Sequence, residues 1–326
     1  MIVRWGLDAY EGLLEELGIA RPLLVTSARW TSLGLRAGKT FDGVGHHVPA
    51  SSVEAATRAA EGCDGVLAVG GGSAIDTGKA VSAALGLPLV SIPTTYSGAE
   101  WTPGYGVLDE EARVKRGGGG AHLAGIVYDE ELTLGLPRAE SGGTAMNALA
   151  HCAEALYVQG RNPDADREAL AGATLIADTL QTVIAEPDNR AARHDLLEGA
   201  MHAGAALAGA GLGLAHALAQ AVGARFGVAH GAANALCLPP ALRFNEPVAH
   251  TEIARFAEAI GAAAEDAPAR VEELARLGGF ERLRDLGVPE DELDAAAEAA
   301  VVRPGARMNP RPVSAAEAAG LLHSIW

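Results

Sequence analysis

Three consecutive glycines, Gly70 to Gly72, constrain the fold of the first third of this chain most strongly. They follow a continuously apolar run at 65–69, which is typical of a parallel strand covered on both faces. A helical segment at 74–85 begins directly after them. Glycines at such a junction let the backbone approach a pyrophosphate, and the N-terminus of the helix behind them attracts the anion. The junction predicts a phosphate-binding loop, and a plain glycine turn is the alternative.

A second loop, at 92–100, follows the next apolar run and carries the hydroxyls of Thr94, Thr95 and Ser97. In an open parallel sheet, ligands bind outside the carboxyl ends of the strands, so these side chains are expected to face the same crevice as the glycines. The glycine spacing matches neither GxGxxG nor a Walker A loop. The two loops together favour a dinucleotide site over an ordinary turn and an ordinary polar loop.

The pattern along the chain changes near Pro137. Before it, apolar runs at 23–26, 65–69 and 87–92 alternate with helical segments at 51–60 and 74–85, and Gly117 to Gly120 indicate a flexible loop. After it, only Ala/Leu/Glu-rich helical periodicity remains. Proline-containing breaks in that periodicity are expected at Asn162-Pro163, Glu186-Pro187, Pro239-Pro240, Glu246-Pro247 and Pro289. We therefore predict a Rossmann-like, parallel-sheet α/β dinucleotide-binding domain over 1–136 and an all-helical substrate and catalytic domain over 137–326.

Charge and composition exclude several classes of partner. The formal net charge is −16, whereas nucleic acids and anionic membranes attract proteins with a positive field. The charge-free stretch at 199–224 is weakly apolar and is expected to form a buried helix rather than a membrane span. The three cysteines have neither a metal-ligand spacing nor a disulfide framework, and no signal peptide is evident. These features predict a soluble cytoplasmic protein.

Several motifs together resemble the iron-containing alcohol dehydrogenase superfamily, and most of all its maleylacetate reductase branch. The likeness extends over nearly the whole chain. It is carried by GGGSAIDTGKA at 70–80, IPTTYSGAE at 92–100, TPGYG at 102–106, VKR at 114–116, IVYD at 126–129, LTLGLP at 132–137, AMNALAH at 145–151 and NPRP at 309–312. This resemblance implies a dehydroquinate synthase-like fold, an NAD(P)-dependent oxidoreductase and a homodimer.

The resemblance also implies which residues bind the cofactor. The glycine loop would hold the pyrophosphate, the hydroxyl loop would contact nicotinamide, ribose or phosphate, and Lys115 would reach the cofactor. The implied cofactor-binding residues are Gly70, Gly71, Gly72, Ser73, Asp76, Thr94, Thr95, Ser97 and Lys115. Many members of the family place a carboxylate for the adenosine ribose after the strand at 23–26, but this chain has Ser27 and Arg29 there. We therefore expect NADPH to be accepted at least as well as NADH.

Four residues of the helical part form the predicted catalytic set. Asn147 and His151 are four apart and share a helix face, and His216 and His230 follow later. Singly, each histidine is more typical of a buried core group. In metal-dependent members of the superfamily the matching positions carry Asp, His, His and His. Because Asn147 is a weak neutral donor, we expect no tightly bound metal; a metal such as zinc, if present, would be held by the three histidines.

Without a metal, the histidines must protonate the oxyanion or enolate that forms as hydride arrives. The proton donor is expected to be His216 or His230, with His151 orienting the substrate. Where maleylacetate reductases carry further histidines, this chain has Gln220 and Asn234, which predicts a weaker dicarboxylate site. The expected substrate is therefore a small oxo acid, enone acid or aldehyde rather than maleylacetate itself. The alternatives are an iron- or zinc-dependent alcohol dehydrogenase, a cofactor-binding protein without catalysis, and a lyase related to dehydroquinate synthase.

Overall fold

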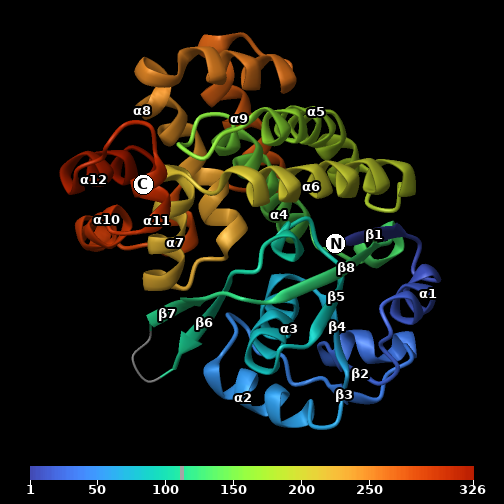
Figure 1. The fold of residues 1–326 in the computed structure, drawn as a ribbon. Helices are drawn as coiled ribbons and strands as arrows, with labels where there is room; N and C mark the ends of the chain where they lie inside the picture. Colours follow the sequence, from blue (N-terminus) through green and yellow to red (C-terminus); the bar gives the residue numbers. More distant parts are fainter. Residues whose placement is uncertain (111–113) are drawn as a thin grey trace. The chain divides into compact units, whose positions relative to one another are not determined.

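The computed structural model describes residues 1–110 and 114–326, which form two compact units (Figure 1). The first unit contains residues 1–95 and 99–133, and the second contains residues 96–98 and 134–326. The short segment at 96–98 thus belongs to the second unit although its flanks belong to the first. Short 3-10 helices occur at Ala28–Leu33, Ala99–Trp101, Glu130–Thr133, Ala264–Asp266, Leu283–Leu286 and Glu290–Glu292.

The first unit is built on a six-stranded parallel sheet, which confirms the predicted α/β class. In spatial order its strands are β1 (Ile2–Trp5), β8 (His122–Tyr128), β5 (Pro88–Pro93), β4 (Gly65–Gly70), β2 (Pro22–Val25) and β3 (Lys39–Phe41). The helices of this unit are α1 (Ala9–Glu16), α2 (Ala50–Ala59) and α3 (Gly72–Leu85). Because β4 and β5 are neighbours, the loops that follow them lie at the same edge of the sheet.

The sheet is buried on both faces, as the continuous apolar runs predict. Leu67 and Val69 of β4 pack into one apolar cluster with α1 residues, and Val66 and Ala68 pack into the other with α2 and α3 residues. Since successive side chains of a strand point to opposite faces, a strand between two helical layers must be apolar at every position.

An antiparallel hairpin, β6 (Tyr105–Asp109) and β7 (Val114–Gly118), also belongs to this unit. The prediction of a flexible loop over Gly117 to Gly120 is therefore wrong for its first two residues, which lie in β7. Gly118 pairs with Tyr105, and a Cβ at Gly118 would lie 2.5 Å from the tyrosine ring. The glycine is needed because the aromatic ring occupies the space of a side chain.

The second unit is helical, which confirms the second half of the predicted fold class (Figure 1). Its helices are α4 (Arg138–Ala155), α5 (Pro163–Ala185), α6 (Arg190–Ala210), α7 (Leu214–Phe226), α8 (His230–Ala259), α9 (Ala267–Gly278), α10 (Leu293–Val301), α11 (Pro304–Met308) and α12 (Ala315–Ser324). Helix α4 is buried along nearly its whole length and packs against α5, α6 and α8. Polar side chains on α4 are therefore enclosed by protein.

Three of the predicted proline breaks, at 162–163, 186–187 and 289, fall at helix ends or outside helices, and the other two lie within α8. Asn162 caps α5 by accepting a hydrogen bond from the Ala165 N–H, and α5 ends before Pro187. The predicted break at 239–240 is wrong, because α8 continues through both prolines there. The break predicted at 246–247 corresponds to a kink in α8 at Ala249, where the torsion angles are non-helical. Packing of α8 against α4, α7 and α9 compensates for the amide hydrogen bonds that the prolines remove.

The charge-free stretch at 199–224 forms the end of α6 and most of α7 rather than one helix. Among the described residues, no single helix is long and apolar enough to cross a membrane. Helices α6 and α7 meet that length and composition only when taken together, and they are bent by 103° at the break between them.

Candidate active site

The helical unit brings the three predicted histidines together. The rings of His151 and His216 are stacked, with centroids 4.6 Å apart and an interplanar angle of 12°. The ring of His230 lies 5.7 Å from that of His216, at 51°. Helix α4 supplies His151, α7 supplies His216, and α8 begins at His230. His151 and His216 are buried, whereas His230 is exposed in the isolated chain.

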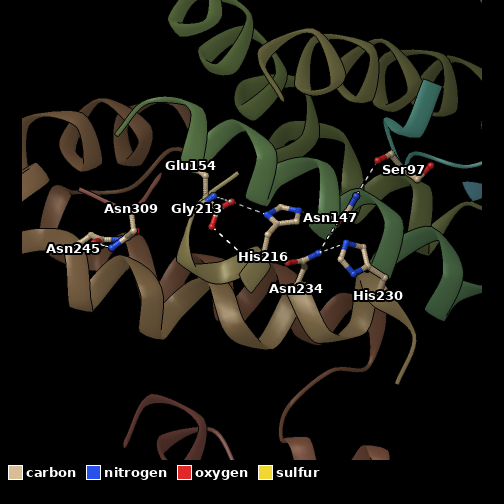
Figure 2. Close-up of polar contacts among 9 residues, drawn as sticks. All are labelled: Ser97, Asn147, Glu154, Gly213, His216, His230, Asn234, Asn245 and Asn309. Carbon is tan, nitrogen blue, oxygen red and sulfur yellow. Dashed lines mark hydrogen bonds and ion pairs between the residues drawn. The ribbon is translucent and has the colours of Figure 1, made fainter. Parts of the chain in front are cut away.

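Asn147 links this cluster to the segment at 96–98 (Figure 2). Its Nδ2 donates a hydrogen bond of 2.9 Å to the backbone carbonyl oxygen of Ser97. Its Oδ1 accepts one of 2.7 Å from Asn234 Nδ2 and lies 3.3 Å from His216 Nε2. Because a carbonyl oxygen can only accept, the contact with Ser97 fixes the amide orientation and directs Oδ1 at His216. An aspartate could not donate this bond.

Glu154 is a site residue that the sequence analysis missed. Its fully buried carboxylate accepts hydrogen bonds from the Gly213 N–H at 2.7 Å and the His216 N–H at 3.2 Å. His216 Nδ1 lies 2.7 Å from Glu154 Oε2. Positions 147, 151 and 154 follow the i, i+4, i+7 spacing of one helix face, and this spacing could have identified the glutamate.

Both ring nitrogens of His216 face hydrogen-bond acceptors. Nδ1 contacts the Glu154 carboxylate, and Nε2 contacts Asn147 Oδ1. The Ser97 carbonyl fixes the Asn147 amide so that this atom is the oxygen, which can only accept. A neutral imidazole has one N–H and can satisfy only one of these contacts, whereas an imidazolium satisfies both. An N–H on Nδ1 would donate to Glu154, and an N–H on Nε2 would donate to Asn147.

The surroundings of His151 favour its neutral form. Burial lowers the pKa of His151 well below its ordinary value, and nearby His216 and His230 lower it further. Its Nδ1 is buried, with no hydrogen-bond partner among the described residues. Gly98, at φ +70°, comes so close that a Cβ there would lie 3.4 Å from this nitrogen and 3.3 Å from the Cα of Gly204. A neutral imidazole with a free nitrogen can accept or donate one hydrogen bond to a bound molecule.

The segment before Gly98 is fixed to the helical unit. The hydroxyl of the fully buried Tyr96 accepts a hydrogen bond of 3.0 Å from Arg193 Nη1. The Tyr96 N–H donates to Thr144 Oγ1 at 3.3 Å. These contacts hold the Ser97 carbonyl against Asn147, so the orientation of the amide depends on residues from three parts of the chain.

In the α/β unit, the glycine loop has an open backbone. Gly70 adopts φ +146°, and α3 begins after Gly71 without a side-chain cap, which leaves backbone N–H groups at the N-terminus of the helix for an anion. The Thr94 N–H donates to the Gly70 carbonyl at 3.0 Å, and a Cβ at Gly71 would lie 3.0 Å from Thr95 Cγ2. Thr95 Oγ1 is buried with no partner within the described ranges. The loop and the threonines fit a pyrophosphate-containing cofactor.

Other predicted cofactor residues have different surroundings. The Asp76 carboxylate is ion-paired with Lys79 at 2.8 Å and accepts a hydrogen bond from the Gly106 N–H at 3.2 Å. Ser73 accepts a hydrogen bond from Thr77 through its backbone carbonyl. The buried Lys79 amine also donates to the carbonyl oxygens of Ala99 and Gly104. These contacts make Lys79 a link between α3 and the loop before β6.

Ser97 and Lys115 lie outside the glycine loop and the threonine segment. Ser97 belongs to the helical unit, where its carbonyl holds Asn147, and its Oγ is buried with no partner among the residues that the structure describes. Lys115 lies in β7, and its side chain falls outside the described part of the chain. The roles of both residues toward a cofactor stay predictions.

The cluster does not fit a tightly bound divalent cation. An ion lies in the plane of each imidazole that ligates it, and the nearly parallel planes of His151 and His216 cannot share one ion. Both nitrogens of His216 already contact Glu154 and Asn147, and position 147 supplies no anionic ligand. Within the described ranges, no three His, Cys, Asp or Glu side chains are grouped to hold a metal.

The sequence matches known families over most of its length. Residues 6–124 match the iron-containing alcohol dehydrogenase profile, and residues 142–326 match the profile of the C-terminal part of the Fe-containing alcohol dehydrogenase family. The maleylacetate reductase of Burkholderia cepacia is 36% identical over 327 residues, which cover 95% of this chain and 91% of that protein.

Solved structures agree with these matches. The maleylacetate reductase of Agrobacterium tumefaciens superposes with a TM-score of 0.90 at 31% identity, over 100% of this chain and 95% of that one. The sulfoacetaldehyde reductase of Bifidobacterium kashiwanohense, solved in complex with NAD+, gives a TM-score of 0.90 at 23% identity, over 100% of this chain and 96% of that one. The latter likeness concerns the fold alone.

Proposed function

Since the chain belongs to the iron-containing alcohol dehydrogenase family and is an oxidoreductase, we propose a specific reaction for it. The protein is a metal-independent, NAD(P)H-dependent reductase of a small carbonyl or enone acid. Relatives that are maleylacetate reductases support an acid as substrate. The buried contacts of His216 with Glu154 and Asn147 are the observation that carries the proposal, because they provide a proton donor where the donor set is unsuitable for a metal.

The glycine loop and the threonines after β5 would bind the cofactor. A reduced nicotinamide, when bound, supplies the hydride. Gly70 to Gly72 would leave room for the pyrophosphate beside the N-terminus of α3, and the unpartnered Thr95 hydroxyl would hydrogen-bond to the cofactor. Ser27 and Arg29 follow β2, the neighbour of β4, so Arg29 would contact a ribose 2′-phosphate. The domain division at 136/137 is proposed on the same basis, with the cofactor bound by the first domain.

His216 would protonate the substrate. Hydride addition to a ketone or to a conjugated enone leaves an alkoxide or enolate, and one proton completes the reduction. His216 gives that proton from Nε2 and keeps the Nδ1 hydrogen on Glu154, so the imidazole stays oriented and is reprotonated from water. His151, kept neutral by burial, orients the substrate through its free nitrogen. A homodimer and a cytoplasmic location stay predictions from the family resemblance.

Replacing the histidines one at a time tests this assignment. The proposal predicts that His216→Asn lowers turnover by at least about 100-fold, the lower range for a lost general acid, while NADPH affinity is unchanged. His202→Asn is the matched control, because His202 makes the same Nδ1 contact with a glutamate at a partly exposed position of α6. Rates would be measured with aldehydes, 2-oxo acids and enone acids against both reduced cofactors. Retained turnover in His216→Asn, with loss only in His230→Asn, would assign the donor to His230 and contradict the proposal.

A further inference from the structure

Arg303 is a half-buried cation without an anionic partner in the helical unit. It directly precedes α11, and burial lowers the pKa of its guanidinium. Its Nε is buried and has no hydrogen-bond partner within the described ranges. The one polar contact of the guanidinium there is from Nη1 to Gln220 Oε1, at 3.4 Å. A desolvated arginine with unused donors is costly unless an anion completes its hydrogen bonds.

The rest of the chain makes this position unusual. Carboxylates outnumber basic side chains by 16, and several arginines of the unit are paired with them. Examples are Arg225 with Glu292 at 2.8 Å and Arg311 with Glu317 at 2.8 Å. Arg303 forms no such ion pair with any described residue. The buried Arg193 instead donates to oxygens of Tyr96, Ser141 and Pro187, whereas Arg303 leaves its buried Nε without an acceptor among the described residues.

Gln220 places this cation next to the imidazoles. It lies on α7 four residues after His216, so the two side chains share a face and are about one helical turn, ~5–6 Å, apart along the axis. The backbone supports this placement, because a Cβ at Gly305 of α11 would lie 2.4 Å from the carbonyl oxygen of Gly213. Gly213 also donates to Glu154, which holds His216. Arg303 is thus anchored to the turn that positions the imidazole.

The chemistry of the pair suits a carboxylate. A guanidinium presents its N–H groups as a planar fork that matches the two oxygens of a carboxylate. Gln220 directs Oε1 at Arg303, so its Nε2 is available as a further donor. A glutamine at position 220 alone predicts a weaker acid site, but the arginine 83 residues further along the chain supplies the missing charge.

We propose that Arg303 and Gln220 form a subsite that binds a carboxylate of the substrate, with the carbonyl to be reduced lying on the order of one helical turn away, at His216. This subsite rests on the proposed function and selects a short oxo acid over a neutral aldehyde. The acid remains unchanged at this end, and the subsite takes no part in the proton transfer.

The test compares an acid with its neutral ester. Rates would be measured with 4-oxobutanoate and with its methyl ester for the wild type, Arg303→Gln and Arg303→Lys. In Arg303→Gln, the ratio of kcat/KM for the acid to kcat/KM for the ester should decrease by a factor of about 10 to 100. This is the loss expected for a charge-assisted hydrogen bond. Arg303→Lys keeps the charge but loses the planar fork, so its acid-to-ester ratio should lie between those of the wild type and Arg303→Gln. Arg307→Gln, which changes an exposed arginine of α11, is the matched control and should keep the wild-type ratio.

Three outcomes would overturn the subsite. One is an unchanged ratio in folded Arg303→Gln, another is an equal loss for acid and ester, and the third is a rise in KM confined to NADPH, which would assign the arginine to a cofactor phosphate. Calorimetric titration with succinate, which cannot be reduced, separates the subsite from the proposed function. Succinate binding that is lost in Arg303→Gln supports the subsite even if no compound is turned over, and binding that persists in that variant contradicts it.

Discussion

Replacing Glu154 with glutamine tests whether the buried carboxylate holds His216 in its working state. The carboxylate accepts three hydrogen bonds, two on Oε2 from Gly213 and the His216 ring and one on Oε1 from the His216 backbone. Glutamine keeps one oxygen, so its amide group must face at least one of these donors. Hydrogen bonds to a charged group contribute about 1.5–3 kcal/mol each. With one bond lost and two weakened, we expect the free energy of unfolding to fall by about 3 kcal/mol.

For a domain of this size, that loss corresponds to a fall in Tm of about 6–12 °C in a calorimetric scan. Turnover should fall about 100-fold, because the imidazole that donates the proton loses the carboxylate that fixes its orientation. The control is Glu168→Gln, which removes the same kind of contact from His202 at 2.6 Å. Since that pair is partly exposed, solvent screening limits its effect to about 1 kcal/mol or less, with unchanged turnover. The reasoning fails if Glu154→Gln loses no more stability and activity than Glu168→Gln.

The remaining predictions concern pH, cofactor and metal. Because the folded pKa of His151 lies below the unfolded value of 6.5, only the unfolded chain gains this proton below pH 6.5. His151 should therefore lower the unfolding free energy as pH falls from 6.5, and its own contribution is at most about 1.4 kcal/mol per pH unit. Urea titration at several pH values should show that His151→Gln reduces the slope by up to this amount, and an unaltered slope would contradict the assignment. The Arg29 guanidinium lies 4.7 Å from the centroid of the Trp30 ring. Arg29→Ala should raise KM for NADPH about tenfold and leave KM for NADH unchanged. An equal effect on both KM values would argue against a contact with the 2′-phosphate. Asn147→Asp adds an anion and should raise Zn²⁺ affinity in calorimetry, whereas a wild type that binds as tightly would show that the amide does not exclude the ion.

The parallel sheet could be predicted where a strand is buried on both faces. The runs that became β2, β4 and β5 are apolar at nearly every position, so composition alone identified them. Strand β3 has three residues, two of them exposed, and it is a strand because β2 lies beside it. The hairpin that contains Gly117 depends on cross-strand pairing in the same way. Local sequence does not encode such partners.

The site could be predicted only as far as helical spacing and family likeness reach. Asn147 and His151 are one turn apart, and the two later histidines were matched to the family's positions. The support for these residues is long-range. Glu154 acts on a residue 62 positions away, and Arg303 contacts one 83 positions away. The role of Ser97 comes from its carbonyl oxygen, which no side-chain pattern can indicate.

The most direct test of the account is the turnover of metal-free protein. Protein purified in the presence of a chelator, and shown by elemental analysis to hold neither iron nor zinc, would be assayed with NADPH and 4-oxobutanoate before and after addition of Fe²⁺ or Zn²⁺. Because His216, held by Glu154 and Asn147, supplies the proton without an ion, we expect the metal-free protein to be fully active and the added ions to give no increase. Activity that is absent without metal and returns with either ion would contradict the account.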